Sequence, residues 1–130
     1  MKSVFEFFVS RLRSVGHACD GLRDILTTEH NAWIHAVFTV IVIPLALLLR
    51  IDFREFALIV IVIVLVWVAE AFNTVLEVVV DMVSPRYSKA AKRAKDIAAG
   101  AVLMASLGAV VVGGALLGPP LYIQLSLLFS

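Results

Sequence analysis

A run of apolar residues long enough to cross a bilayer carries carboxylates, and this feature constrains the fold most strongly. Residues 56–81 read FALIVIVIVLVWVAEAFNTVLEVVVD, and their strongly polar side chains are Glu70, Asn73, Glu77 and Asp81. An ionised carboxylate in hydrocarbon costs about 3 kcal/mol on insertion scales and more in simulations. A chain that keeps several of them is expected to use them, so these residues are the first candidates for a functional site.

The spacing of the four polar residues places them on one side of a helix. At about 100° per residue they fall within an arc of roughly 80°. Asn73, Glu77 and Asp81 follow one another at intervals of four, so their polar ends form a column. Capping or snorkelling accounts for Asp81, which lies near the predicted membrane boundary. Glu70 and Glu77 are not explained in this way, because no basic residue lies near them in the sequence.

The composition predicts a single small membrane domain. The chain has 130 residues, of which 62% are hydrophobic, so we expect its apolar side chains to be shared with lipid. Three segments, about 31–49, 56–80 and 97–117, are apolar and long enough to span. Gly118-Pro119-Pro120 is expected to end the third. The prediction is an all-α integral membrane protein in which residues 1–130 form one domain with three transmembrane helices.

The first thirty residues are predicted to form a separate element. Apolar residues such as Phe8 and Leu12 recur there at helical spacing, with Ser10, Arg11 and Arg13 between them. This pattern is typical of an amphipathic helix lying in the headgroup plane of a membrane. We therefore expect residues 1–30 to form a surface helix rather than a further span.

The basic residues predict the orientation. Nine of the 11 Lys and Arg residues lie before the first span or between the second and third, and two lie in the remaining loop. The nine are Lys2, Arg11, Arg13, Arg23, Arg86, Lys89, Lys92, Arg93 and Lys95, and the two are Arg50 and Arg54. Because cytoplasmic loops carry the excess of positive charge, we expect the amino terminus inside and the carboxyl terminus outside a bacterial inner membrane.

This orientation gathers polar residues at the cytoplasmic side. Glu77 and Asp81 approach that surface at the end of the second span, Glu29 at the start of the first, and Lys95-Asp96 at the start of the third. Carboxylates and an amide beside lysines suit Mg²⁺ that carries phosphates, and the lysines offset the remaining phosphate charge. The sequence contains no GxxxxGK[ST] loop and no HExxH motif.

The motifs around these residues resemble the prokaryotic diacylglycerol kinase family. EAFNTVLEVVVD (70–81) is similar to that family's E-x-x-N-[ST]-x-x-E-x-x-x-D, and KRAKDIAAGAVL (92–103) to its A-K-D-x-[AG]-[AS]-[AG]-A-V. Upstream, the segment 29–35 resembles E-x-N-x-x-I-H, the form that favours the undecaprenol kinase branch. The resemblance extends from about Ala18 to Gly114.

The resemblance implies a homotrimeric membrane lipid kinase with active sites between protomers at the cytoplasmic surface. ATP with Mg²⁺ is the implied phosphoryl donor, and the acceptor is the hydroxyl of a membrane lipid, with undecaprenol favoured and diacylglycerol next. The implied partners are therefore the lipid, ATP and further copies of the chain. No nucleic-acid partner is expected.

The resemblance also implies roles for individual residues. Glu70 corresponds to the general base that contacts the lipid hydroxyl, and Asn73 would position the reacting groups. Glu29 and Glu77 correspond to the Mg²⁺ ligands. Asp81 matches the motif without an assigned role.

The implied nucleotide contacts come from several parts of the chain. They are His17, Glu29, Glu77, Tyr87, Lys95 and Asp96. At the amino-terminal contact, Arg11 and Arg13 are alternatives to His17.

Two other interpretations remain open from the residues themselves. Buried carboxylates also mark ion pathways, which would make the chain a subunit of a small proton- or ion-coupled transporter. A ridge of small residues at intervals of four, namely Ala101, Ala105, Ala109 and Gly113, would suit a purely structural membrane module held together by close helix packing.

Overall fold

The chain folds into α-helices throughout the part that the structure describes. The structure is a computed structural model that describes residues 4–129, so residues 1–3 and 130 of the predicted domain lie outside the described residues. The helices are α1 (Val4–Thr28), α2 (His30–Leu48), α3 (Phe53–Val83) and α4 (Lys89–Leu128). Residues 4–129 contain no strand, and the predicted all-α class is confirmed.

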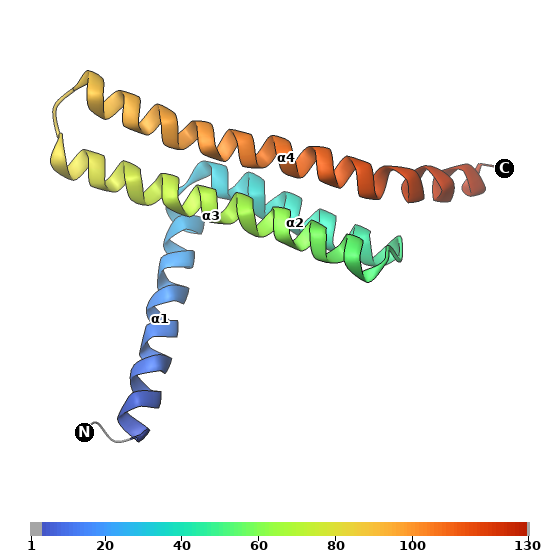
Figure 1. The fold of residues 1–130 in the computed structure, drawn as a ribbon, viewed down its shortest axis with the longest axis horizontal. Coiled ribbons are helices and arrows are strands. Elements are labelled where there is room, and N and C mark those ends of the chain that lie inside the picture. The colour runs from blue at the N-terminus through green and yellow to red at the C-terminus, as the bar shows by residue number, and fades with distance from the viewer. Residues whose placement is uncertain (1–3, 130) are drawn as a thin grey trace.

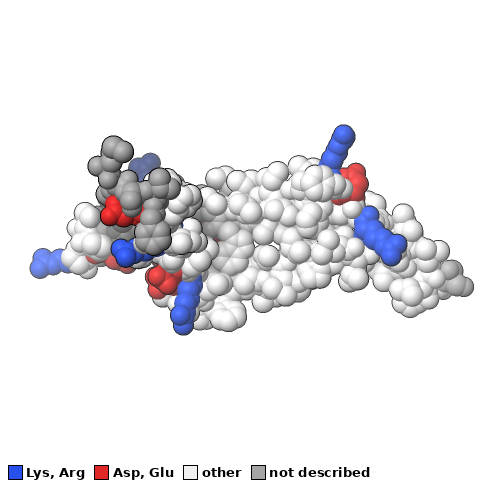
Figure 2. All heavy atoms as spheres, turned by 90° about the horizontal axis from the view of Figure 1, so that it is seen from below, with Lys and Arg blue, Asp and Glu red and all other residues white. Residues whose placement is uncertain are grey.

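The helices α2, α3 and α4 are each long and apolar enough to cross a membrane. They run along a common direction, and α3 and α4 lie side by side, while α1 leaves the bundle steeply (Figure 1). Figure 2 shows the visible charged side chains toward the two ends of the molecule, with an uncharged surface between them. An uncharged band of this kind fits the hydrocarbon layer of a bilayer.

A capping box fixes the start of α3. Asp52 Oδ1 accepts hydrogen bonds from the backbone N–H groups of Arg54 (2.6 Å) and Glu55 (2.9 Å), and the Glu55 carboxylate accepts one from the Asp52 N–H at 3.1 Å. These bonds satisfy donors that a helix otherwise leaves free at its first turn. The helix therefore begins before the apolar run, and α3 covers Phe53–Val83 rather than the predicted 56–80.

Removing this cap is expected to weaken the α2–α3 hairpin. The Asp52→Ala substitution leaves two N–H groups without their acceptor, and we expect it to lower the free energy of unfolding by about 1 kcal/mol. Thermal unfolding of the purified protein in detergent measures the change. Arg54→Ala is the matched control, since Arg54 contributes only its backbone to the cap; equal losses in both variants would contradict the assignment.

The predicted end of the last helix at residue 117 is wrong. The helix α4 continues through Pro119 and Pro120 to Leu128. Each proline lacks an N–H group, so the carbonyls of Ala115 and Leu116 lose their usual helical donors. The proline φ angle is nevertheless compatible with a helix, and membrane helices tolerate such losses where neighbouring groups satisfy the freed carbonyls.

The same helix also starts earlier than predicted. The side chain of Ser88 accepts a hydrogen bond from the Ala91 N–H at 3.5 Å and caps the helix, which begins at Lys89 instead of residue 97. As a result, Lys95 and Asp96 lie within α4, about two turns after its first residue.

The core of the bundle is small. Its central contact joins Ala46 of α2, Ile59 of α3 and Leu117 of α4, which are 1%, 1% and 7% exposed. Most of the other large apolar side chains are exposed on the surface of the single chain. Exposed apolar area on this scale fits contact with lipid or with further membrane helices.

The glycines in the outer half of α4 have open space beside them in the described chain. A Cβ atom added at Gly113, Gly114 or Gly118 would find no atom within 4 Å apart from its own helix backbone. Of the predicted ridge, Gly113 therefore makes no close contact with another helix among residues 4–129, whereas Ala105 and Ala109 are half-buried.

Candidate active site among the membrane helices

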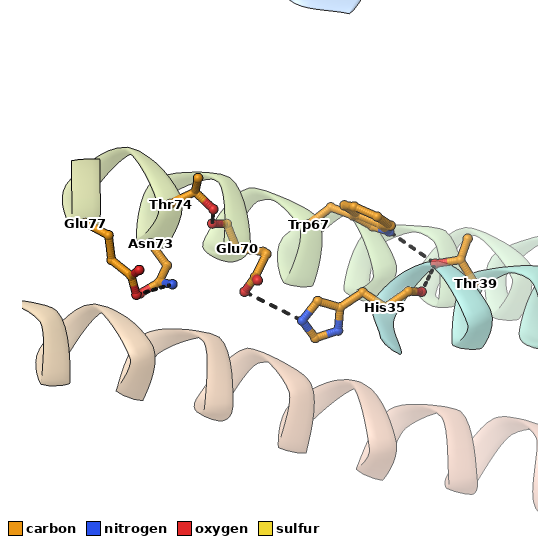
Figure 3. Close-up of polar contacts among 7 residues, drawn as sticks. All are labelled: His35, Thr39, Trp67, Glu70, Asn73, Thr74 and Glu77. Atoms are coloured by element: carbon orange, nitrogen blue, oxygen red, sulfur yellow. Dashed lines mark hydrogen bonds and ion pairs between the residues drawn. The ribbon is translucent and has the colours of Figure 1, made fainter. Parts of the chain in front are cut away.

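The polar residues of α3 form a ladder that runs from the interior of the bundle to its charged end. Glu70, Asn73 and Thr74 are buried, with exposed fractions of 0%, 5% and 9%. Glu77 is half-buried and Asp81 is exposed. The Thr74 hydroxyl donates to the Glu70 backbone carbonyl at 3.0 Å, so that hydroxyl is satisfied within the helix, whereas the carboxylates point outward from it (Figure 3).

The antiparallel packing of α2 against α3 determines which residues of α2 face the polar residues of α3. The Trp67 Nε1–H donates to Thr39 Oγ1 at 3.1 Å, and one turn away His35 Nε2 lies 3.7 Å from Glu70 Oε2. Both contacts are visible in Figure 3. A step of three residues forward along α3, from Trp67 to Glu70, is thus matched by a step of four residues backward along α2, from Thr39 to His35.

Glu29, at the start of α2, and Glu77, near the end of α3, lie toward the same end of the bundle, and the charge of each acts on Glu70. Glu29 stands at the junction of α1 and α2 as the N-cap of α2, but its side chain accepts no capping hydrogen bond. Its half-buried carboxylate is therefore not used by the helix that it starts.

Three carboxylates share this end of the bundle. The charges of Glu29 and Glu77 both act on Glu70, together with the imidazole of His35. Neither oxygen of the Glu70 carboxylate accepts a hydrogen bond from the described residues. Because like charges in a medium of low polarity repel strongly, this arrangement favours the arrival of a cation or of a polar ligand.

Asn73 connects two members of the ladder. Its Nδ2 donates to Glu77 Oε1 at 3.2 Å, while its own buried Oδ1 accepts no hydrogen bond within residues 4–129. The bond fixes the Glu77 carboxylate along the helix, and the free oxygen is open to a further donor.

The helix α4 contributes basic groups to the same end. Lys95 Nζ forms an ion pair with Asp81 Oδ1 across to α3 at 2.7 Å, and Lys92 Nζ pairs with Asp96 Oδ2 within α4 at 2.7 Å. These groups are partly or mostly exposed, and such pairs contribute only about 0–1 kcal/mol each. They can therefore exchange partners with an arriving phosphate.

Residues predicted to form the site are brought together only in part. The described structure gathers Glu29, Glu70, Asn73 and Glu77, with Lys95 and Asp96 at the same end of the bundle. His17 is exposed in the middle of α1, which projects away from the bundle (Figure 1). Tyr87 is 82% exposed in the turn before α4. The predicted nucleotide contacts of His17 and Tyr87 are thus not assembled within one chain.

The donor set is compatible with Mg²⁺ bound together with phosphates. No group of three or more His, Cys, Asp or Glu side chains among residues 4–129 is arranged to hold a metal ion, so these residues do not form a complete metal cage. Glu29 and Glu77 supply two carboxylates, and Mg²⁺ commonly uses one or two, completing its shell with substrate phosphates and water.

Two features of the site are not anticipated by the sequence pattern. His35 faces Glu70, although the sequence analysis gives it no role beyond its place as the last residue of the motif at 29–35. A cavity of about 470 Å³ also lies between α2, α3 and α4, with a mostly apolar lining and polar groups from His35, Thr39, Trp67 and Ser106. Pairing the spans as antiparallel neighbours and matching their polar residues would have indicated the first feature.

The comparisons with known proteins all match the chain to proteins that are named as lipid kinases. The family model described as prokaryotic diacylglycerol kinase matches residues 16–117. A protein named diacylglycerol kinase from Synechocystis is 41% identical over 121 residues, which cover 92% of this chain and 69% of that protein. An undecaprenol kinase from Bacillus subtilis is 31% identical over 101 residues, covering 78% and 82%. A diacylglycerol kinase from Escherichia coli is 29% identical over 104 residues, covering 80% and 85%.

Proposed function

The chain belongs to the prokaryotic diacylglycerol kinase family, and we propose that it transfers the γ-phosphoryl group of ATP to the hydroxyl of a membrane lipid. One observation about the site supports this proposal most directly. The Glu70 side chain is fully buried among apolar helices, and both of its oxygens are free to accept a hydrogen bond from a ligand. An alcohol within the membrane supplies the donor that this carboxylate lacks.

In the proposed reaction Glu70 is the general base. The proton of the lipid hydroxyl passes to the Glu70 carboxylate while the hydroxyl oxygen forms a bond to the γ-phosphorus, and the bond from that phosphorus to ADP breaks. Asn73 holds the neighbouring Glu77 carboxylate through its 3.2 Å hydrogen bond and orients the groups around the reaction. Phosphoryl transfer depends mainly on positioning and charge neutralisation, which suits a site of this composition.

Mg²⁺ is proposed to bind between Glu29 and Glu77 together with the nucleotide. When bound, the ion offsets the negative charge of the phosphates. The free Glu29 side chain at the start of α2 and the fixed Glu77 carboxylate supply the two protein ligands. Lys95 leaves Asp81 to contact the phosphates, and Asp96 lies beside it in the nucleotide site.

The remaining proposed nucleotide contacts, His17 and Tyr87, require a neighbouring copy of the chain. Both are exposed on the single chain, and α1 points away from the bundle (Figure 1). A homotrimer would place these residues against the site of an adjacent protomer and would cover part of the exposed apolar surface.

The proposed location is a bacterial inner membrane. The surplus of Lys and Arg on one side of the predicted spans supports a cytoplasmic amino terminus and a cytoplasmic active site, with the carboxyl terminus outside. In this orientation α1, which runs across the direction of the bundle (Figure 1), would lie along the inner surface.

Two lipid substrates have specific support. The segment 29–35 favours undecaprenol, which we propose as the preferred substrate, whereas the relative with 41% identity is named a diacylglycerol kinase. Both lipids present a hydroxyl near the headgroup layer, so the apolar contacts decide between them.

A side-by-side assay tests the proposal. The purified protein in detergent micelles is given labelled ATP, Mg²⁺ and either undecaprenol or diacylglycerol, and the labelled lipid products are separated and counted. We expect a higher kcat/KM with undecaprenol. A preference for diacylglycerol would reverse the substrate assignment, and failure to label either lipid would contradict the kinase function. Flux of ions in liposomes without ATP consumption would favour the transporter interpretation instead.

A further inference from the structure

The side chain of His35 is held in a defined place between α2 and α3. Its ring packs edge-on against Trp67, with 6.3 Å between the ring centroids. The Thr39 hydroxyl donates to the His35 carbonyl at 2.7 Å and accepts from Trp67 Nε1 at 3.1 Å. These hydrogen bonds, drawn in Figure 3, connect the His35 backbone through Thr39 to Trp67 of α3. The imidazole is therefore positioned by its edge-on contact with Trp67 and by the backbone that carries it.

The fixed ring faces Glu70. His35 Nε2 lies 3.7 Å from Glu70 Oε2, beyond hydrogen-bond length but within ion-pair distance, and the two side chains are 14% and 0% exposed. The buried Nε2 has no hydrogen-bond partner among residues 4–129. The Glu70 carboxylate and His35 Nε2 are thus close enough for an ion pair but too far apart for a hydrogen bond. Both groups can therefore still form a hydrogen bond when a ligand enters.

The charges around Glu70 make this contact important. Among the described residues, the groups whose charges act on Glu70 are Glu29, Glu77 and His35. Of these, only His35 can be positive. A buried carboxylate surrounded by further carboxylates is strongly disfavoured unless a cationic or donor group offsets it.

We propose that His35 is a positioning residue that acts through Glu70, pairing its imidazole with Oε2 so that the carboxylate stays charged and presents Oε1 to the lipid hydroxyl. This inference rests on the proposed function, because it takes Glu70 to be the base. The pair offsets the charge of Glu70 within the membrane between turnovers, when no substrate is there to do so. His35 itself does not contact the phosphoryl group.

The steady-state kinetics of a His35→Gln variant test the inference. Glutamine can still donate an N–H group but cannot become positive, so we expect kcat to fall about tenfold, less than for loss of a general base itself. KM for ATP and for lipid should stay within about twofold, because neither ligand is bound by His35. The matched control is His30→Gln, at the exposed first residue of the same helix, which should retain wild-type kinetics. A kcat within about twofold of wild type in His35→Gln would overturn the proposal.

A second measurement does not depend on activity. Thermal unfolding is compared for His35→Ala in the native background and in the Glu70→Gln background. We expect a loss of about 5 °C with the native glutamate present, because the carboxylate then lacks its partner, and a loss of about 1 °C or less in the background that lacks this carboxylate. Equal losses in both backgrounds would show that His35 only fills space.

The two measurements separate this inference from the kinase assignment. An inactive wild-type protein with both lipids contradicts the proposed function, while the unfolding comparison still decides whether the pair exists. An active wild type with an unimpaired His35→Gln variant contradicts the inference alone. If His35→Gln does not fold, His35→Asn replaces it as the neutral amide variant, with the same expected loss of kcat and the same limit for rejection.

Discussion

The Glu70→Gln variant is expected to lose lipid phosphorylation while keeping its fold. The substitution preserves the shape of the side chain but removes the group that accepts the hydroxyl proton, and general-base catalysis contributes roughly 10²–10⁴-fold to rates. We expect kcat to fall by about 10³-fold. The measurement is transfer of label from ATP to lipid at saturating lipid and Mg²⁺. Thermal stability should stay close to that of wild type, because the amide keeps the size and shape of the buried side chain and can still accept an N–H group from His35, which lies 3.7 Å from Glu70.

A matched control lies at the other end of the same helix. Glu55→Gln makes the identical chemical change, and glutamine can still complete the capping box with Asp52. Its kinetics should match wild type. Wild-type turnover in Glu70→Gln would remove Glu70 from the role of base, and an unfolded Glu70→Gln protein would give it a structural role instead.

The Glu77→Gln variant is expected to require far more Mg²⁺. The amide oxygen of glutamine can still accept the hydrogen bond from Asn73, so the geometry is kept while one negative charge is lost. Mutating a residue that only hydrogen-bonds to a metal ligand typically lowers the affinity for the metal by about 10–100-fold. Glu77 is proposed to bind the ion directly, so we expect its substitution to raise the Mg²⁺ concentration for half-maximal rate by about 100-fold.

A Mg²⁺ titration at fixed ATP measures this effect, and a parallel ATP titration at high Mg²⁺ separates metal binding from nucleotide binding. The rate at saturating Mg²⁺ should recover a large part of the wild-type value. An unchanged Mg²⁺ requirement would argue against Glu77 as a ligand, and the Glu29 carboxylate would then have to bind the ion without it.

The spans were predictable because hydrocarbon selects long apolar runs, but the lengths of the helices were not. The capping box at Asp52 and the Ser88 cap extend α3 and α4 beyond their apolar runs. Pro119 and Pro120 made the predicted third helix too short at its carboxyl end. They break helices readily in water, where the chain has alternatives, yet α4 continues through both.

The ladder on α3 was predictable from spacing, whereas its partners were not. Helical periodicity places Glu70, Asn73 and Glu77 on one face whatever the rest of the chain does. The contact of His35 with Glu70 depends on the register between two helices, which is set by side-chain packing such as the Trp67–Thr39 bond. His17 is exposed on α1, away from the polar residues of α3, and its proposed contact with the nucleotide remains a prediction.

The length of α4 has a mechanical consequence. Its 40 residues extend about 60 Å at 1.5 Å per residue, roughly twice the thickness of the hydrocarbon layer. Lys95 stands near one end of this rod, where it pairs with Asp81, and the two prolines stand toward the other end; we expect variation in bilayer thickness to be taken up at that second end. Under the proposed function, the position of Lys95 relative to the nucleotide would then not depend on the thickness of the bilayer.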